Sequence, residues 1–254
     1  MRIIGLAKNT FREGVRDRLF FTIGIFAVAI LVASFIIGPL SLGEQQRITQ
    51  DLGLASISVL TFLIAVLIGT GIIYKEIERK TIYTVLSKPV SRWKFIVGKF
   101  LGLNAIVAVL VVGMAVILMV VNTVVTRSFQ PALLTAVFLI WMELVLLTAL
   151  SVLMSTLCSP ILGAIFTFLL YIAGHTSADL KELAVRFGSA SVKALAHFGY
   201  YVLPNLEYLN VKSKVIHGVH VDGAYVAFAC SYALLYTVVF LTLAILVFQR
   251  REFR

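Results

Sequence analysis

Long apolar stretches dominate this sequence and limit what it can fold into. A helix needs roughly 20 apolar residues to cross the hydrocarbon of a bilayer. Five stretches reach that length: residues 19–42, 52–74, 95–125, 131–157 and 224–248. A sixth, residues 161–174, is shorter and follows the fourth after Cys158-Ser159-Pro160, so we expect a tight helical hairpin turned by the proline. At 60% hydrophobic and 13% charged residues, the chain is too apolar for a soluble domain. We predict an all-α integral membrane protein with six transmembrane helices in a single domain, residues 1–254.

Lysine and arginine are distributed unevenly between the predicted connections. Most of the 22 lie in the N-terminal segment, the second connection and the C-terminal tail. The short loops on the opposite side contain Arg47 and Arg127, and the others lie in one long loop. Basic residues in short loops favour the cytoplasmic side of a membrane. We therefore expect a multi-pass protein of the plasma membrane with both termini in the cytoplasm. Topology also explains the net charge of +10, so we expect no nucleic-acid partner.

Two segments outside the apolar stretches have helical patterns of their own. In residues 1–18, apolar side chains recur at helical spacing from Ile4 to Val15, with charged side chains on the other side. This pattern indicates a helix lying in the membrane interface, and an ordinary basic flank is the alternative. In residues 175–222 we expect short amphipathic helices outside the membrane, interrupted by Gly188 and Gly199.

The second connection, residues 75–94, has the pattern of a short, charged helical elbow. Glu76 and Lys80 form an i,i+4 pair in the favourable order. A small apolar patch is formed by Ile77, Ile82, Val85 and Leu86. Ser87 and Pro89 then stop the helix, and Ser91 is placed to cap the next one. A basic loop that only sets topology would not explain the glutamates, the patch or the proline. The elbow therefore favours contact with a cytoplasmic partner.

The same segment resembles the first cytoplasmic loop of type-2 ABC transporter permeases, the six-helix membrane subunits of ATP-binding-cassette exporters. The residues that carry the resemblance are Glu76, Thr81, Leu86, Ser87, Pro89, Arg92 and Lys99. The N-terminal helix and residues 155–160 and 201–210 also resemble this family, particularly its branch that includes the permeases of copper-enzyme maturation systems. The resemblance covers essentially the whole chain.

Several expectations follow from the resemblance. It implies that the elbow docks on a separate ABC ATPase subunit through Glu76, Glu78, Arg79, Lys80, Thr81, Val85, Leu86, Pro89 and Arg92. It implies a permease dimer, either a homodimer or a heterodimer, with ATP and Mg²⁺ bound by the partner ATPase and a substrate exported. It also implies an extracytoplasmic gate near Tyr201, Pro204, Asn205 and Glu207.

Motifs for catalysis by the chain itself are missing. A phosphate-binding P-loop needs Gly-x-x-x-x-Gly-Lys-Ser/Thr, but Gly98-Lys99 has Trp93 at the first glycine position and Phe100 at the hydroxyl position. Neither His-Glu-x-x-His nor Gly-x-Ser-x-Gly occurs. We expect a transport subunit that binds no cofactor and is not an enzyme. A membrane-embedded enzyme would require His175, Glu207 and Asp222 to meet in one cleft.

Glu143 is the one acid in the middle of a predicted span. A charge there costs several kcal/mol unless it faces protein or water. Two interpretations stay open: a packing glutamate that is protonated or hydrogen-bonded, or a residue of the transport path. The second makes a self-sufficient channel or ion-coupled carrier the alternative function. His217 and His220 could supply two nitrogens to a metal, but solvated loop histidines are the simpler interpretation, and we expect no metal site.

Small residues at four-residue spacing, Gly98 with Gly102 and Ser151 with Ser155, are typical of helices that approach closely.

Overall fold

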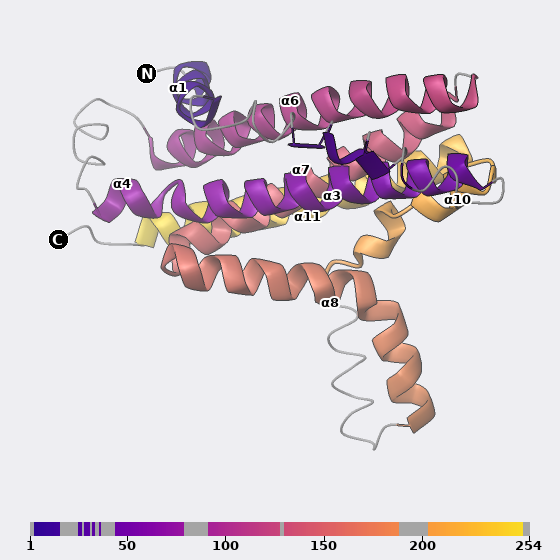
Figure 1. Cartoon of the computed structure of the whole chain (residues 1–254). Coiled ribbons are helices and arrows are strands. Elements are labelled where there is room, and N and C mark those ends of the chain that lie inside the picture. The colour runs from indigo at the N-terminus through magenta and orange to yellow at the C-terminus, as the bar shows by residue number, and fades with distance from the viewer. Residues whose placement is uncertain are drawn as a thin grey trace.

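The chain was analysed as a computed structural model (Figure 1). The structure describes residues 3–15, 25–26, 28–30, 32–33, 36, 44–78, 91–127, 130–187 and 203–250. In these residues the secondary structure is entirely helical: α1 (Ile3–Val15), α3 (Gln45–Gly71), α4 (Tyr74–Glu78), α6 (Arg92–Thr126), α7 (Ala132–Leu157), α8 (Pro160–Phe187), the 3₁₀ helix η2 (Leu206–Leu209), α10 (Lys212–Ile216) and α11 (Gly223–Arg250). The predicted all-α class is therefore confirmed for the described part of the chain.

Five of the described helices are long and apolar enough to cross a membrane. They are Gln45–Gly71, Arg92–Val124, Ala132–Leu157, Pro160–Ser177 and Gly223–Arg250, and they correspond to the second through sixth predicted stretches. Most of the first stretch, residues 19–42, lies outside the described residues. Within it, Phe26 and Ile30 are helical and are buried in the main apolar core.

Helix α7 is the centre of the bundle. In the 18-residue apolar part of α7, 83% of the helix is buried inside the protein, compared with 22% in the corresponding parts of α8 and α11. Its sequence is apolar on all sides, so it can be buried among protein neighbours on every side. Side chains from α3, α6, α8 and α11 cover it. The outer helices instead expose apolar side chains that suit lipid, such as Val116, Ile165 and Leu235.

Long helices that follow one another in the chain run in opposite directions, so their ends gather at two ends of the bundle (Figure 1). The α1 end contains α1, α4, the start of α6, the α7–α8 turn and the end of α11. The α10 end contains the start of α3 and α10. Ile3 and Arg250, the first and last described residues, both belong to helices that reach the α1 end.

The predicted hairpin is present between the third and fourth described spans, α7 and α8. Helix α7 ends at Leu157, where the Cys158 amide still donates to the Met154 carbonyl at 3.0 Å. Extended backbone at Cys158 then breaks the helix, and Pro160 is the first residue of α8. Proline suits this position because the first turn of a helix does not need its N–H.

Helix α8 continues well beyond the predicted stretch and reaches Phe187. Residues 180–187, expected in a separate amphipathic helix, thus belong to α8, and its last part turns away from the bundle (Figure 1). The second expected amphipathic helix, near residue 195, falls outside the described residues. Two other short helices, η2 and α10, precede α11.

Candidate functional site

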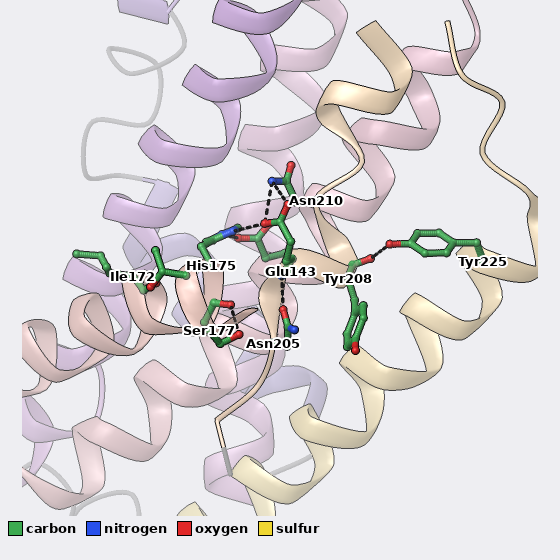
Figure 2. A network of polar contacts seen from close by, with 11 residues as sticks. Glu143, Ile172, His175, Ser177, Asn205, Tyr208, Asn210 and Tyr225 are labelled. Atoms are coloured by element: carbon green, nitrogen blue, oxygen red, sulfur yellow. Dashed lines mark hydrogen bonds and ion pairs between the residues drawn. The ribbon is translucent and has the colours of Figure 1, made fainter. Parts of the chain in front are cut away.

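The interior of the bundle contains an acid–histidine pair. Glu143 lies near the middle of α7 and is only 1% exposed. Its Oε1 lies 2.8 Å from Nε2 of His175, which is on the neighbouring helix α8 (Figure 2). A lone acid at this depth would be costly. The partner histidine explains how a charged or hydrogen-bonded glutamate is accommodated there.

A second carboxylate faces the other side of the imidazole. Oε2 of Glu207, in η2, lies 3.6 Å from Nδ1 of His175. The Asn210 side-chain amide donates to both oxygens of Glu207, at 3.2 and 3.1 Å. The Glu207 side chain is 49% exposed. His175 therefore stands between a buried carboxylate and a half-exposed one.

The segment that carries Glu207 is held by its own backbone contacts. Asn205 caps η2, since its side-chain oxygen accepts from the Glu207 amide at 3.0 Å. The Asn205 amide in turn donates to the Tyr232 hydroxyl of α11 at 2.7 Å. Leu206 and Leu209 are fully buried in the main core. This packing brings residues 204–210 into the bundle beside α7 and α8.

Gly174 makes this close approach possible. A Cβ atom at Gly174 would lie 2.7 Å from Cγ of Leu206 and 2.9 Å from the Pro204 carbonyl oxygen. No side chain could be accommodated without moving the η2 segment. The glycine next to His175 is therefore required by the path of residues 204–210.

Aromatic rings enclose the inner side of this cluster. The Tyr171 ring meets the His175 ring edge-on at 4.6 Å, and Phe62 of α3 stacks on Tyr171 at 4.1 Å. Such surroundings exclude water and strengthen the interaction between charges. Among the described residues, Oε2 of Glu143 has no hydrogen-bond partner although it is buried.

The three residues required for a membrane enzyme do not all converge. His175 and Glu207 come together, but Asp222 lies at the start of α11, where its Oδ1 faces the Ala224 amide at 3.5 Å. His217 is exposed, and its Nδ1 contacts the Ser213 carbonyl oxygen at 2.8 Å. Within the described residues, no three His, Cys, Asp or Glu side chains are grouped to hold a metal ion.

Only the two ends of the predicted elbow can be placed. Glu76, Glu78 and Arg92 are among the described residues, as are the expected gate residues Pro204, Asn205 and Glu207. The other predicted residues lie outside the described part of the chain. They are the elbow residues Arg79, Lys80, Thr81, Val85, Leu86 and Pro89, and the gate residue Tyr201.

The entry to the elbow is fixed to α6 and α7. Glu76 of α4 forms an ion pair with Lys99 of α6, a lysine that is only 2% exposed. The Ser155 hydroxyl of α7 accepts from the amides of Ile73 and Tyr74, at 3.1 and 3.2 Å. The turn between α3 and α4 is therefore bound to both neighbouring helices.

The exit from the elbow is fixed to α11. Nη1 of Arg92 donates to the Gln249 carbonyl oxygen at 2.6 Å and lies 3.4 Å from that of Phe248. These carbonyls belong to the last turn of α11, where a cation is favourable. Three residues later, Phe95 stacks on Phe248 at 5.6 Å. The described residues on either side of 79–90 are thus attached to the membrane helices.

Comparison with known families agrees with this architecture of long apolar helices joined by a charged elbow. Residues 4–253 match the family model described as ABC-2 family transporter protein. The chain belongs to the ABC-2 transporter family. It is accordingly a multi-pass membrane component of an ABC transporter, a transport subunit that is not itself catalytic. Membership also implies association with an ABC ATPase subunit. No curated protein matches the chain.

Two features of this ABC-2 permease were not anticipated from its sequence. The pairing of Glu143 with His175 joins residues on different helices, and the composition of the apolar stretches gave no signal for it. Lys99 was part of the family motif, but Lys80 offered Glu76 a nearer partner in sequence. The depth of Lys99 in the third predicted span was the available clue, because a buried lysine needs an acid.

Proposed function

We propose that this chain is the permease subunit of an ABC exporter in the plasma membrane. Six helices cross the bilayer, and two permeases, identical or different, associate with two copies of a separate ATPase that binds ATP and Mg²⁺. Nucleotide binding draws the elbows of the two permeases together, the helices tilt, and a path opens near Pro204, Asn205 and Glu207. The family match over residues 4–253 supports the transporter class.

The attachment of the elbow at both ends is the observation that carries this mechanism. A force applied to residues 79–90 would pass through Glu76 and Lys99 into α6, and through Arg92 into α11. A loop without such attachments would move by itself and leave the helices in place. The arrangement therefore suits a mechanical contact with a motor subunit.

The proposed orientation places the α1 end of the bundle in the cytoplasm. The described basic residues at that end include Lys8, Arg12, Arg92 and Lys94. Toward the α10 end, the short connections contribute Arg47 and Arg127, and α10, in the long loop, contributes Lys212 and Lys214. This distribution supports cytoplasmic termini and a cytoplasmic elbow.

The test combines copurification with ATP turnover. Thr81→Gly together with Ile82→Gly should lower both the amount of ATPase that copurifies and its stimulation by the permease, each by at least about tenfold. The matched control is Val219→Gly with His220→Gly, in an exposed loop at the α10 end. If the elbow variant kept full ATPase binding and full turnover, the coupling role would be wrong.

One observation favours a second candidate, an ion-coupled carrier that works alone. The buried Glu143–His175 pair is the kind of titratable group that such carriers place near the middle of the membrane. Liposomes containing only the purified permease would distinguish the two functions. Solute uptake driven by a proton gradient, without ATPase or ATP, would support the carrier and contradict the exporter.

A further inference from the structure

The imidazole of His175 faces carboxylates from two different elements. Nε2 lies 2.8 Å from Glu143 on α7, and Nδ1 lies 3.6 Å from Glu207 on η2. A neutral imidazole carries a hydrogen on one ring nitrogen only, whereas an imidazolium carries one on both. Both carboxylates are therefore faced by an N–H only when His175 holds its second proton.

The buried carboxylate of Glu143 also favours a positive charge beside it. Oε2 of Glu143 is buried and, among the described residues, lacks a hydrogen-bond partner. A carboxylate removed from water is costly unless a cation, a proton or a hydrogen-bond donor compensates it. His175 is the ion-pair partner that the structure gives to Glu143. The group is thus built around a proton that can be gained or lost.

We propose that Glu143, His175 and Glu207 form a proton-binding site that fastens residues 204–210 to α7 and α8. With the proton bound, the imidazolium bridges the buried and the half-exposed carboxylate. When the proton leaves to solvent, the single remaining N–H of His175 continues to donate to Glu143, because that carboxylate is buried and cannot hydrogen-bond to water. Glu207 then loses its attraction to His175, and the η2 segment is loosened, held only by the buried Leu206 and Leu209 and by the hydrogen bond from Asn205 to Tyr232.

Other polar groups around the imidazole set how readily it holds the proton. Lys212, the first residue of α10 after η2, carries a positive charge that opposes an imidazolium, whereas the carboxylate of Glu207 favours it. Tyr171 contacts the ring from within α8. Removing the charge of Lys212 or of Glu207 should therefore move proton binding in opposite directions.

The test is hydrogen–deuterium exchange of the backbone amides of residues 205–210, in the full-length permease reconstituted alone in nanodiscs. Exchange is measured from about pH 5 to about pH 10 and corrected for the intrinsic pH dependence of amide exchange. In the wild type, the corrected exchange should rise about two- to fivefold as pH increases through the loss of the His175 proton, which is the effect expected of one half-exposed ion pair. His175→Gln should abolish this transition, while His217→Gln, at an exposed histidine near the same end, should preserve it.

Two milder variants protect the test against simple misfolding. Glu207→Gln should move the midpoint of the transition to lower pH by about one unit, and Lys212→Gln should move it to higher pH. A pH-independent wild-type profile, a transition that persists in His175→Gln, or midpoints that shift in the same direction would each overturn the proposal. A structural role alone would not produce opposite shifts.

This proton site does not rest on the proposed exporter mechanism. The measurement involves no ATPase and no transported substrate, so a failure of the elbow to bind an ATPase would leave its result unchanged. If the exporter mechanism also holds, the loosening of residues 204–210 makes the proposed gate sensitive to pH on the side that the α10 end faces.

Discussion

Charged side chains inside this bundle occur with partners from other helices. Lys99 is paired with Glu76 near the α1 end, and Glu143 is paired with His175 in the interior. A buried ion pair adds little net stability compared with an apolar pair, but removing one partner leaves an uncompensated charge. The consequence of a substitution at these positions therefore depends on whether the partner is changed as well.

Lys99→Met should destabilise the protein by about 3 kcal/mol, because Glu76 loses the ammonium that compensates it in a partly buried position. The measurement is chemical unfolding in detergent, followed by tryptophan fluorescence. The double variant Lys99→Met with Glu76→Gln should recover most of the loss. If the double variant were as unstable as Lys99→Met alone, packing of the lysine and not its charge would be responsible.

At the residue scale, the sequence predicts which side chains are unusual better than it predicts their partners. Glu143 was identifiable because an acid within an apolar run is costly wherever the helix packs. His175 could not be assigned to it, since that contact depends on the rotation of α7 and α8 about their axes. Helix rotation is decided by packing with other elements, such as the fit of Leu206 against Gly174.

At the scale of elements, the contact between α1 and α6 depends on two glycines. In Figure 1, α1 is seen nearly end-on while α6 runs across the view, so the two helices cross steeply. A Cβ atom at Gly98 would lie 2.7 Å from Cβ of Leu6, and one at Gly102 would lie 2.8 Å from the Ala7 carbonyl oxygen. The expected close approach at this glycine pair is therefore made with α1.

Gly102→Ala should displace α1, because the backbone oxygen of Ala7 cannot move aside as a flexible side chain could. We expect a loss of about 1–3 kcal/mol in the docking of α1, detected as faster deuterium exchange in residues 3–15. Gly5→Ala is the matched control, since a Cβ atom at Gly5 meets nothing within 4 Å. Unchanged exchange in Gly102→Ala would contradict the requirement for glycine at this crossing.

Helix limits were predicted well where composition changes sharply and poorly where polar residues continue a helix. The fourth stretch, residues 131–157, agrees closely with α7, Ala132–Leu157. Helix α3 instead begins at Gln45, seven residues before the apolar stretch does. Its polar start is stabilised by Gln50, whose amide donates to Asn122 at 2.9 Å and to Gln130 at 2.5 Å. Such partners come from distant segments and have no local signature.

At the scale of the whole molecule, the orientation in the membrane can be tested with single cysteines. Cys158 and Cys230 are first replaced by serine, and Ser91→Cys or Ser213→Cys is then added at an exposed position near the α1 end or the α10 end. In intact cells, a membrane-impermeant maleimide should label the Ser213→Cys variant and leave the Ser91→Cys variant unlabelled until the cells are opened. Labelling in the reverse order would invert the proposed topology.

The all-helical class followed from the apolar stretches alone, because a bilayer admits few other backbones. The central position of α7 did not follow, since its sequence is no more apolar on one side than on another. The apolar stretches have similar compositions, so composition does not indicate which of them lies at the centre. The polar contacts of Ser155, Glu143 and Thr148 distinguish α7, and each depends on a partner from another helix.

Helix α7 also connects the two regions to which a function is proposed here. Ser155 binds the turn before the elbow, and Glu143 belongs to the proton site. Ser155 follows Glu143 by twelve positions, which corresponds to about 18 Å of continuous helix. No proline or glycine interrupts this part of α7. This part of α7 is a continuous, rigid helix. If an ATPase displaced the turn before the elbow, α7 would move as a unit, and the distance between Glu143 and His175 would change. Proton release and the ATP cycle would then be coupled through one helix, without a contact between their sites.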